Sequence, residues 1–213
     1  MAVRGRDAAF PLPSLVEQIA AGARGVVMAM GKGGLCKITV AAAVAVSLAI
    51  RGHRAILTTT DPAAHVAGVL PNPPSNLTLT PAETAAYTAG VLVDAGRELD
   101  AHAYALLDED LRSPCMEEVA VFYAFARAVA ATSGCYVGID TAPTGHTLLL
   151  LDSSRSFARQ VTPQTGALPE AASTLLDTLA DPDRTRILLV TLPEATPVHE
   201  ARKLQADLAS AGI

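Results

Sequence analysis

Four short runs of apolar residues recur along the chain, and within them apolar positions do not alternate with polar ones. The runs cover residues 25–30, 54–60, 135–140 and 186–192. A strand buried on both faces of a parallel sheet has this continuous pattern, whereas a strand with one solvated face alternates. The runs therefore predict four inner strands of a mainly parallel sheet.

Helical patterns accompany these strands. Residues 38–51 are apolar almost all round, which predicts a helix buried against the sheet, while residues 196–211 are amphipathic. Pro197 near the start of the second helix and Gly212 just after its end are typical boundary residues. This alternation predicts an α/β fold with a doubly wound, mainly parallel sheet, which binds ligands at the carboxyl edge of its strands.

The domain organisation follows from where the alternation is interrupted. Residues 1–13 resemble a linker, so we expect one domain over residues 14–213, beginning with a short helix. About 75 residues separate the second run from the third, which is more than a simple crossover needs. Helical patterns at 82–110 and 116–132 predict an inserted helical subdomain at about 82–132.

Composition narrows the function classes. The chain has 213 residues, of which 50% are hydrophobic and 17% charged, and its net charge is −5. These values exclude a disordered chain, and the lack of a basic stripe argues against nucleic acid or an anionic membrane surface as partner. Three cysteines without a CxxC pair predict a reducing, cytoplasmic location. The longest apolar run is shorter than a membrane-spanning helix requires.

A glycine-rich segment lies between the first predicted strand and the next helix. Backbone N–H groups of such a loop, together with the positive end of the helix dipole, form a binding site for phosphate. A lysine at the start of the helix could reach the outer phosphates. The alternative is a merely tight turn. The candidate phosphate-binding residues are Gly31, Lys32, Gly33, Gly34, Leu35, Cys36, Lys37, Ile38 and Thr39.

This loop departs from the P-loop pattern G-x-x-x-x-G-K-[ST] at two positions. The pattern requires glycine at position 36 and serine or threonine at position 38, where this chain has Cys36 and Ile38. The cysteine adds bulk where the backbone approaches phosphate, and the isoleucine lacks the hydroxyl that binds Mg²⁺. Thr39 lies one position too late to replace that hydroxyl. We therefore expect nucleotide binding, with weaker support for metal-assisted hydrolysis.

Two acidic residues follow predicted strands and are candidate catalytic groups. Asp61 comes after the second strand, where a carboxylate could orient the attacking water. Asp140 ends the third strand, where a phosphate-hydrolysing site has a carboxylate on the Mg²⁺ side. The alternative for each is a helix cap, and Pro62 after Asp61 is compatible with one.

Five segments, taken in order, resemble the arsenical pump-driving ATPase family, and more closely the C-terminal of its two homologous halves. They are GKGGLCKIT, TTTDPAAH, LRSPCMEEVAVF, DTAPTGHTLLLLD and LLVTLPEATP. The family has a P-loop NTPase fold with a deviant Walker A motif, whose extra signature lysine matches Lys32. The resemblance implies that Lys37 binds phosphate, that Asp61 positions water, and that Asp140 lies on the Mg²⁺ side.

The same resemblance implies a site for As(III) or Sb(III), with ligands that match Cys115, His146 and Ser113 and that are shared with the other half. The residues support this independently, since Ser113 and Pro114 predict a helix start and Cys115 then lies in the first turn, where thiolate is favoured. A soft trivalent metalloid prefers thiolate. The alternatives are a small buried cysteine and a loop histidine with a structural role.

By resemblance, the chain is expected to hydrolyse ATP and to energise the extrusion of arsenite or antimonite. Its expected partners are a homologous ATPase half, a membrane pump subunit that would hold it at the membrane periphery, and a metallochaperone. One alternative is a catalytically impaired nucleotide- or metalloid-binding half. A lower-ranked alternative is a tail-anchored-protein targeting ATPase, because a CxxC zinc site is lacking and only 4 methionines are present. The last predicted helix runs almost to Ile213, so we expect a C-terminally incomplete domain.

Overall fold

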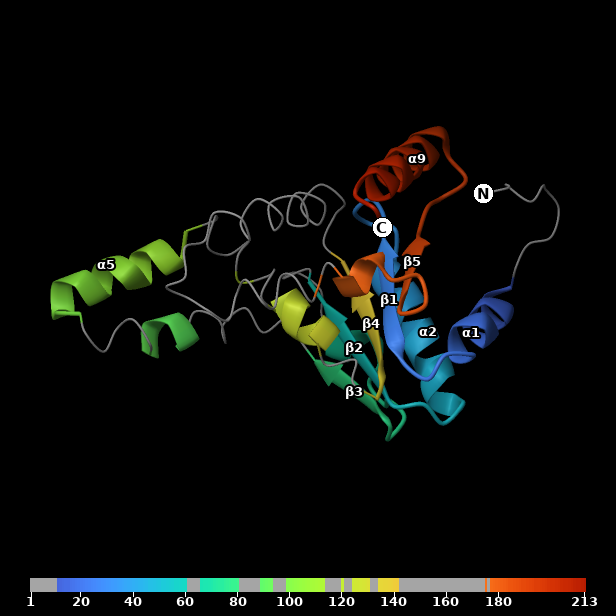
Figure 1. Cartoon of the computed structure of the whole chain (residues 1–213), viewed down its shortest axis with the longest axis horizontal. Coiled ribbons are helices and arrows are strands. Elements are labelled where there is room, and N and C mark those ends of the chain that lie inside the picture. The colour runs from blue at the N-terminus through green and yellow to red at the C-terminus, as the bar shows by residue number, and fades with distance from the viewer. Residues whose placement is uncertain are drawn as a thin grey trace.

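The computed structural model has a central parallel sheet with helices on both faces, and a helical arm that extends away from it (Figure 1). All structural statements below concern the residues that it describes, which are 11–60, 66–80, 89–93, 99–113, 120, 124–130, 134–141, 175 and 177–213. Within these residues, the predicted doubly wound α/β fold is confirmed.

The sheet has five parallel strands in the order β3-β2-β4-β1-β5. The four predicted strands are confirmed with shifts of at most three residues at their ends. The fifth strand, β3, was missed by the sequence analysis and pairs with β2 at one edge. The bounds are β1 Gly25–Met30, β2 Ala55–Thr59, β3 Leu77–Thr80, β4 Tyr136–Asp140 and β5 Thr185–Leu189.

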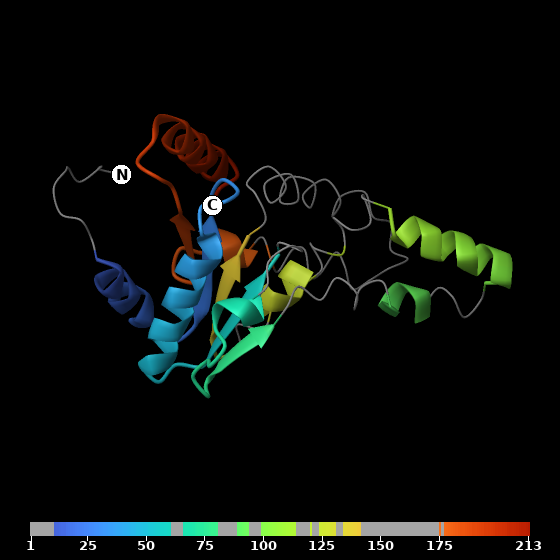
Figure 2. The same cartoon turned by 180° about the vertical axis from the view of Figure 1, so that it is seen from behind.

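One face of the sheet is covered by α1 (Leu12–Ala20) and α2 (Lys37–Ile50), which Figure 2 shows from behind. Helix α1 begins two residues before the predicted start, because Pro13 is tolerated in a first helical turn. Helix α2 turns alanines toward the sheet, and four of them are buried: Ala41, Ala42, Ala45 and Ala49. Small side chains allow the helix backbone to lie close to the strands, which accounts for the alanine-rich segment at 41–49.

The opposite face is covered by residues 124–130, by residues 177–180 and by α9 (Ala195–Ser210). Phe125 and Val129 pack there against strand residues that include Met28 and Ile139. Strands β1 and β4 are buried along their whole length, as a two-sided core requires. The absence of polar–apolar alternation in the sequence therefore has a direct structural cause.

The connection after β1 runs along the α1–α2 face to β2, whereas residues 177–180, which precede β5, pack on the other face. Strands β1 and β4 are neighbours, with Ala29 opposite Asp140. Adjacent strands whose connections leave toward opposite faces open a crevice at their carboxyl ends, and α/β sheets bind ligands there. The fold thus brings the loop after β1 and the end of β4 to one place.

Among the described residues of the predicted inserted subdomain, 89–93, 101–111 and 124–130 are helical, but the helical pattern expected over 82–110 is interrupted. Residues 89–93 are helical, Leu99 and Asp100 are not, and α5 (Ala101–Leu111) begins after them. The break has a local cause, because the Asp100 carboxylate accepts hydrogen bonds from the N–H groups of His102 and Ala103 and so caps a new helix.

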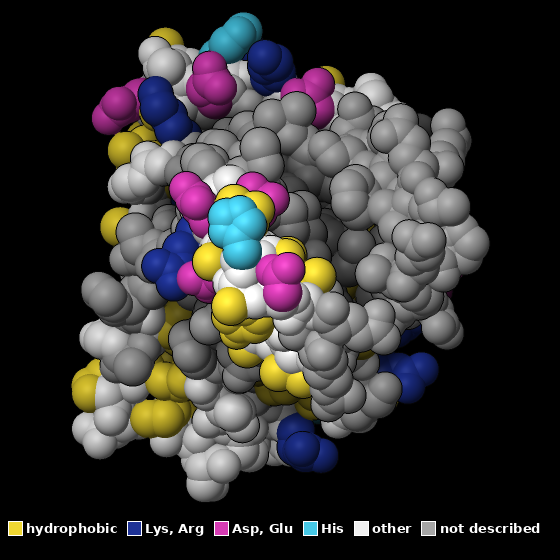
Figure 3. Space-filling model, turned by 90° about the vertical axis from the view of Figure 1, so that its left-hand side faces the viewer, with side chains coloured by type: hydrophobic (Ala, Val, Ile, Leu, Met, Phe, Trp, Pro, Cys, Tyr) yellow, Lys and Arg dark blue, Asp and Glu magenta, His cyan; other side chains and the backbone are white. Residues whose placement is uncertain are grey.

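Helix α5 lies apart from the sheet in both views of the fold (Figures 1 and 2). Of its side chains only Leu111 is buried, and acidic side chains gather around the helix where it faces the viewer in Figure 3. Glu109 and Asp110 of this helix are exposed. None of the helices in the described ranges is both long enough and apolar enough to cross a membrane.

The phenol of Tyr136 joins the start of β4 to the end of α1. Its hydroxyl donates to the carbonyl of Ile19 at 2.9 Å and also approaches the carbonyl of Gly22. The side chain is 2% exposed, and burial raises its pKa above the ordinary 10.0, an effect that Arg186 partly offsets. Since the folded state favours the protonated phenol, its contribution to stability is present below pH 10 and is lost as the pH rises beyond it.

We predict that Tyr136→Phe lowers the free energy of unfolding by about 1–2 kcal/mol, because buried carbonyl groups lose a donor. Tyr104→Phe is the matched control, since Tyr104 lies on α5 and is 41% exposed. Urea denaturation of both variants checks this. The unfolding free energy of the parent should also fall above pH 10 more steeply than that of Tyr136→Phe. Equal losses in the two variants would contradict the role of the hydroxyl.

Candidate functional site

The loop of residues 31–39, called the 31–39 loop below, connects β1 to α2. Its first residue, Gly31, has a φ of +153°, and a Cβ at that position would lie 2.3 Å from the carbonyl oxygen of Val190. Both the backbone conformation and the close approach require glycine. The chain after β5 therefore fixes the direction in which the loop leaves the sheet.

Cys36 is the N-cap of α2 and has left-handed backbone angles, with φ +55° and ψ +34°. Among the described residues it is the one non-glycine residue with a positive φ. Left-handed angles cost a residue with a Cβ about 1–2 kcal/mol, and glycine little. The P-loop pattern has glycine at this position, and the geometry explains why. The thiol of Cys36 is exposed.

Lys37 is the first residue of α2, and it is 6% exposed despite its charge. Its Nζ donates a hydrogen bond of 3.3 Å to the carbonyl oxygen of Lys32, so the side chain folds back across the 31–39 loop. An ammonium group that folds over a glycine-rich loop at a helix N-terminus lies where an anion would be attracted. The phosphate-binding roles of Gly31 and Lys37 stay predictions.

Asp140 lies at the carboxyl end of β4, level with Ala29 of β1, and is 4% exposed. Its Oδ2 accepts a hydrogen bond of 3.1 Å from the Thr59 hydroxyl, which comes from the end of β2. Next to it, the hydroxyl and the N–H of Thr141 both donate to the carbonyl of Ala29. The carboxylate is therefore held in one place at the edge where the 31–39 loop begins.

Sequence reasoning missed Thr59 as a partner of Asp140. The two residues are 81 positions apart, and they meet because β2 and β4 are paired in the register that places Thr59 opposite Asp140. The signal available in the sequence was the run of three threonines at the end of the second apolar run, where hydroxyl groups near a buried carboxylate are useful partners.

The residues of the loop fit phosphate, but they do not supply the oxygen that a Mg²⁺ ion takes from a P-loop. Ile38 occupies the position of the usual Ser or Thr, and its side chain packs against the apolar cluster between α2 and the sheet. Thr39 has a hydroxyl but is exposed. The side chains of the loop therefore provide no hydroxyl at the usual position, and Asp140 is the residue predicted on the Mg²⁺ side.

Three of the predicted site residues lie outside the described residues: Asp61, Cys115 and His146. Ser113, the remaining predicted metalloid ligand, is half-buried and follows the end of α5, where its N–H donates to the carbonyl of Asp110. Within the described ranges, no three His, Cys, Asp or Glu side chains gather as a metal site would require. The predicted metalloid site therefore stays a prediction.

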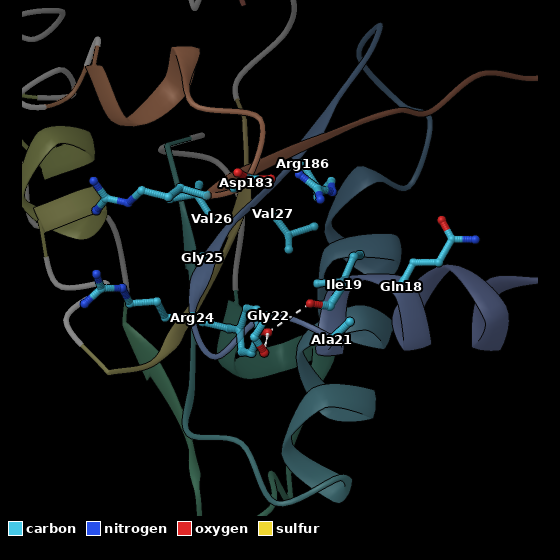
Figure 4. A pocket seen from close by; sticks show the side chains of 12 residues that line it. Gln18, Ile19, Ala21, Gly22, Arg24, Gly25, Val26, Val27, Asp183 and Arg186 are labelled. Carbon is cyan, nitrogen blue, oxygen red and sulfur yellow. Dashed lines mark hydrogen bonds between the residues drawn. The ribbon is translucent and has the colours of Figure 1, made fainter.

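A cavity of about 280 Å³ lies at the opposite edge of the sheet, beside the start of β1. Its charged lining residues do not converge on a ligand, because the side chains of Arg24 and Arg186 point away from each other (Figure 4). Tyr136 also lines the cavity, and its hydroxyl donates to the carbonyl of Ile19 in α1 and approaches that of Gly22 just after α1 (dashed lines in Figure 4). We assign this cavity to packing between α1 and the sheet.

Comparison with known proteins assigns the chain to a family. A family model described as "Anion-transporting ATPase" matches residues 24–165, which include the loop and both candidate catalytic aspartates. The chain belongs to this anion-transporting ATPase family. The resemblance that the sequence motifs suggested is therefore confirmed, and with it membership in a family of ATP hydrolases.

Several relatives are named "Arsenical pump-driving ATPase". The protein from Acidiphilium multivorum is 49% identical over 206 residues and the one from Escherichia coli 48%, each covering 95% of this chain. A relative from Halobacterium salinarum, also named for an arsenical pump-driving ATPase, is 32% identical over 84% of the chain. The chain spans 35% of the length of the first two relatives, about a third.

We predict that Cys36→Gly raises the free energy of unfolding by about 1 kcal/mol, because glycine adopts the left-handed angles of position 36 at little cost. Cys36→Ala removes the thiol but keeps a Cβ, so it should leave stability close to that of the parent. Chemical denaturation of the three proteins measures the difference. If the alanine and glycine variants gain equally, backbone strain at position 36 is not the cause.

Proposed function

We propose that this chain is an ATP-binding half of a metalloid-stimulated ATPase, which energises the extrusion of arsenite or antimonite through a membrane pump. The observation that carries the proposal is the 31–39 loop, where Lys37 is buried against the loop backbone at the N-terminus of a 14-residue helix. Backbone N–H groups, a helix dipole and an ammonium group form a typical site for the phosphates of a nucleotide.

The proposed roles of Lys37 and Asp140 are supported by their places at one edge of the sheet, and that of Asp61 by its place in the sequence. Lys37 binds phosphate oxygens, and the hydrogen bond that it now makes to Lys32 is exchanged for one to the ligand. Asp61, two positions beyond the end of β2, positions the attacking water. Asp140, held by Thr59, supplies the carboxylate on the metal side of the phosphates. A preorganised carboxylate needs little rearrangement when charge develops during hydrolysis.

The metalloid part of the proposal rests on the relatives and on the residues after α5. Cys115, His146 and Ser113 are the proposed ligands of As(III) or Sb(III), each shared with ligands from a homologous half. One thiolate cannot hold a thiophilic ion tightly, so the second half is needed to complete the site. The proposed partners are that half, a membrane pump subunit that keeps the chain at the cytoplasmic membrane surface, and a metallochaperone.

A second candidate is favoured by specific observations: a half that binds nucleotide but hydrolyses it slowly or not at all. Cys36 holds strained backbone angles where the P-loop pattern has glycine, and Ile38 lacks the hydroxyl of that pattern. Both departures weaken catalysis more directly than they weaken phosphate binding, since the N–H donors and Lys37 are retained.

We predict that Lys37→Met lowers the affinity for ATP about tenfold or more, because a charge-assisted hydrogen bond to phosphate contributes about 1.5–3 kcal/mol. The control is Arg24→Met, which removes one positive charge from the other edge of the sheet and should leave affinity within about twofold, since screening weakens distant charges. Equilibrium binding of a fluorescent ATP analogue measures both. Equal effects of the two substitutions would show that only net charge matters and would overturn the proposed site.

Phosphate release from ATP separates the two candidates. It is measured with and without antimonite, for the parent and for a variant carrying Cys36→Gly and Ile38→Thr. The leading proposal predicts release by the parent that antimonite stimulates. The second candidate predicts a silent parent and an active variant. If both proteins bind ATP and neither releases phosphate, the residues at positions 36 and 38 do not explain the lack of hydrolysis. Both the leading proposal and the second candidate would then be wrong.

A further inference from the structure

We infer that nucleotide binding at the 31–39 loop is independent of Mg²⁺, and that Ile38 is the residue that makes it so. In a loop with serine or threonine at this position, the cation bridges the protein and the phosphates and strengthens their association. Here the backbone N–H groups and the lysines carry the binding alone. The inference rests on the proposed nucleotide site and specifies the form of ligand that the site accepts.

The side chain of Ile38 does not serve as a metal ligand. It lies in the first turn of α2, is half-buried, and packs against the apolar cluster that joins α2 to α1 and the sheet. A hydrocarbon side chain in this place cannot donate an oxygen to Mg²⁺, which is bound almost entirely through oxygen ligands. Its side chain packs in the core, whereas the P-loop pattern has a hydroxyl that binds the metal at this position.

Thr39 does not substitute for the missing hydroxyl. The N–H groups of Thr39 and Val40 both donate to the carbonyl of Cys36, so the helix begins directly after the loop. The helix start therefore does not allow Thr39 to move by one residue into the position of Ile38. Successive residues of an α-helix point about 100° apart. The hydroxyl of Thr39 is accordingly on an exposed side chain, on a different side of the helix from Ile38.

The threonine hydroxyls at the ends of β2 and β4 already make hydrogen bonds between neighbouring strands. Thr59 donates its hydroxyl hydrogen to Asp140, and Thr141 donates to the carbonyl of Ala29. Both are nearly fully buried, with exposures of 3% and 0%. They hold the strand ends in register, which makes them poor replacements for a hydroxyl at the start of α2.

The charge that Mg²⁺ would neutralise is met by the loop itself. Lys32 and Lys37 lie in the same loop, the first turn of α2 contains no acidic residue, and the helix dipole adds positive potential. Hydrogen bonds from ammonium or backbone N–H groups to phosphate oxygens require no cation. The loop therefore binds the phosphates without a cation that bridges them to the protein.

The test compares the affinity for ADP in excess Mg²⁺ and in EDTA, measured by titration calorimetry on the full 213-residue chain. The parent should give two dissociation constants within about threefold, a difference below about 1 kcal/mol. Ile38→Thr introduces the missing hydroxyl and should make binding about tenfold or more tighter in Mg²⁺ than in EDTA. Ile38→Val is the matched control, because valine has the shape of threonine without the hydroxyl, and it should behave as the parent does.

Each other outcome has a defined meaning. Binding by the parent that is much tighter in Mg²⁺ overturns the inference and leaves the proposed function intact. If the parent is independent of Mg²⁺ but Ile38→Thr and Ile38→Val do not differ, the role assigned to Ile38 is wrong. No binding of ADP in either condition removes the proposed nucleotide site itself, and the inference with it.

Discussion

The close approach of Gly31 to the carbonyl of Val190 is the contact on which the rest of the site depends. With 2.3 Å available for a Cβ, only glycine allows the chain to leave β1 at this angle. The N–H of Val190 in turn donates to the carbonyl of Met30 at 2.8 Å, which extends the pairing of β1 with β5 to the end of the strand. The edge strand thus fixes the start of the 31–39 loop, and the loop fixes the start of α2.

The two ends of the loop are under opposite constraints. At its start glycine is present where geometry requires it, whereas at its end Cys36 adopts left-handed angles that glycine would adopt more easily. Strain of this kind persists only where the surroundings determine the backbone, and the alanine-rich packing of α2 on the sheet supplies that determination. The backbone at the start of α2 is thus fixed by packing, even though two side chains of the loop depart from the P-loop pattern.

The sequence predicted the inner part of the fold because β1 and β4 are buried on both faces, and such strands are continuous apolar runs. It missed β3, since four residues that alternate between leucine and threonine next to a proline-rich loop give a weak signal. The sequence predicted a continuous helical pattern over 82–110, but the side chain of Asp100 caps a new helix within it. Hydrogen bonds of this kind do not change the spacing of apolar residues. Helix propensity alone does not show at which residue a capping hydrogen bond ends one helix and begins the next.

Some features of the candidate site, like some of the fold, could be predicted from the sequence and others could not. Lys37 and Asp140 were predictable because each is tied to the end of an element that the sequence shows plainly. The pairing of Thr59 with Asp140 was not, because it depends on the register between strands that are distant in the sequence. The roles of all these residues stay predictions: phosphate binding by Lys37, the metal-side carboxylate of Asp140, water positioning by Asp61, and metalloid binding by Cys115, His146 and Ser113.

Backbone amide NMR of the chain during a titration with ADP tests the central claim most directly, because it reports on each N–H group of the phosphate site. The account predicts that the largest shifts occur in the amide signals of residues 32–37, with little change near Gly22 and Arg184 at the opposite edge of the sheet. Shifts confined to that opposite edge, or no shifts at saturating ADP, would contradict it.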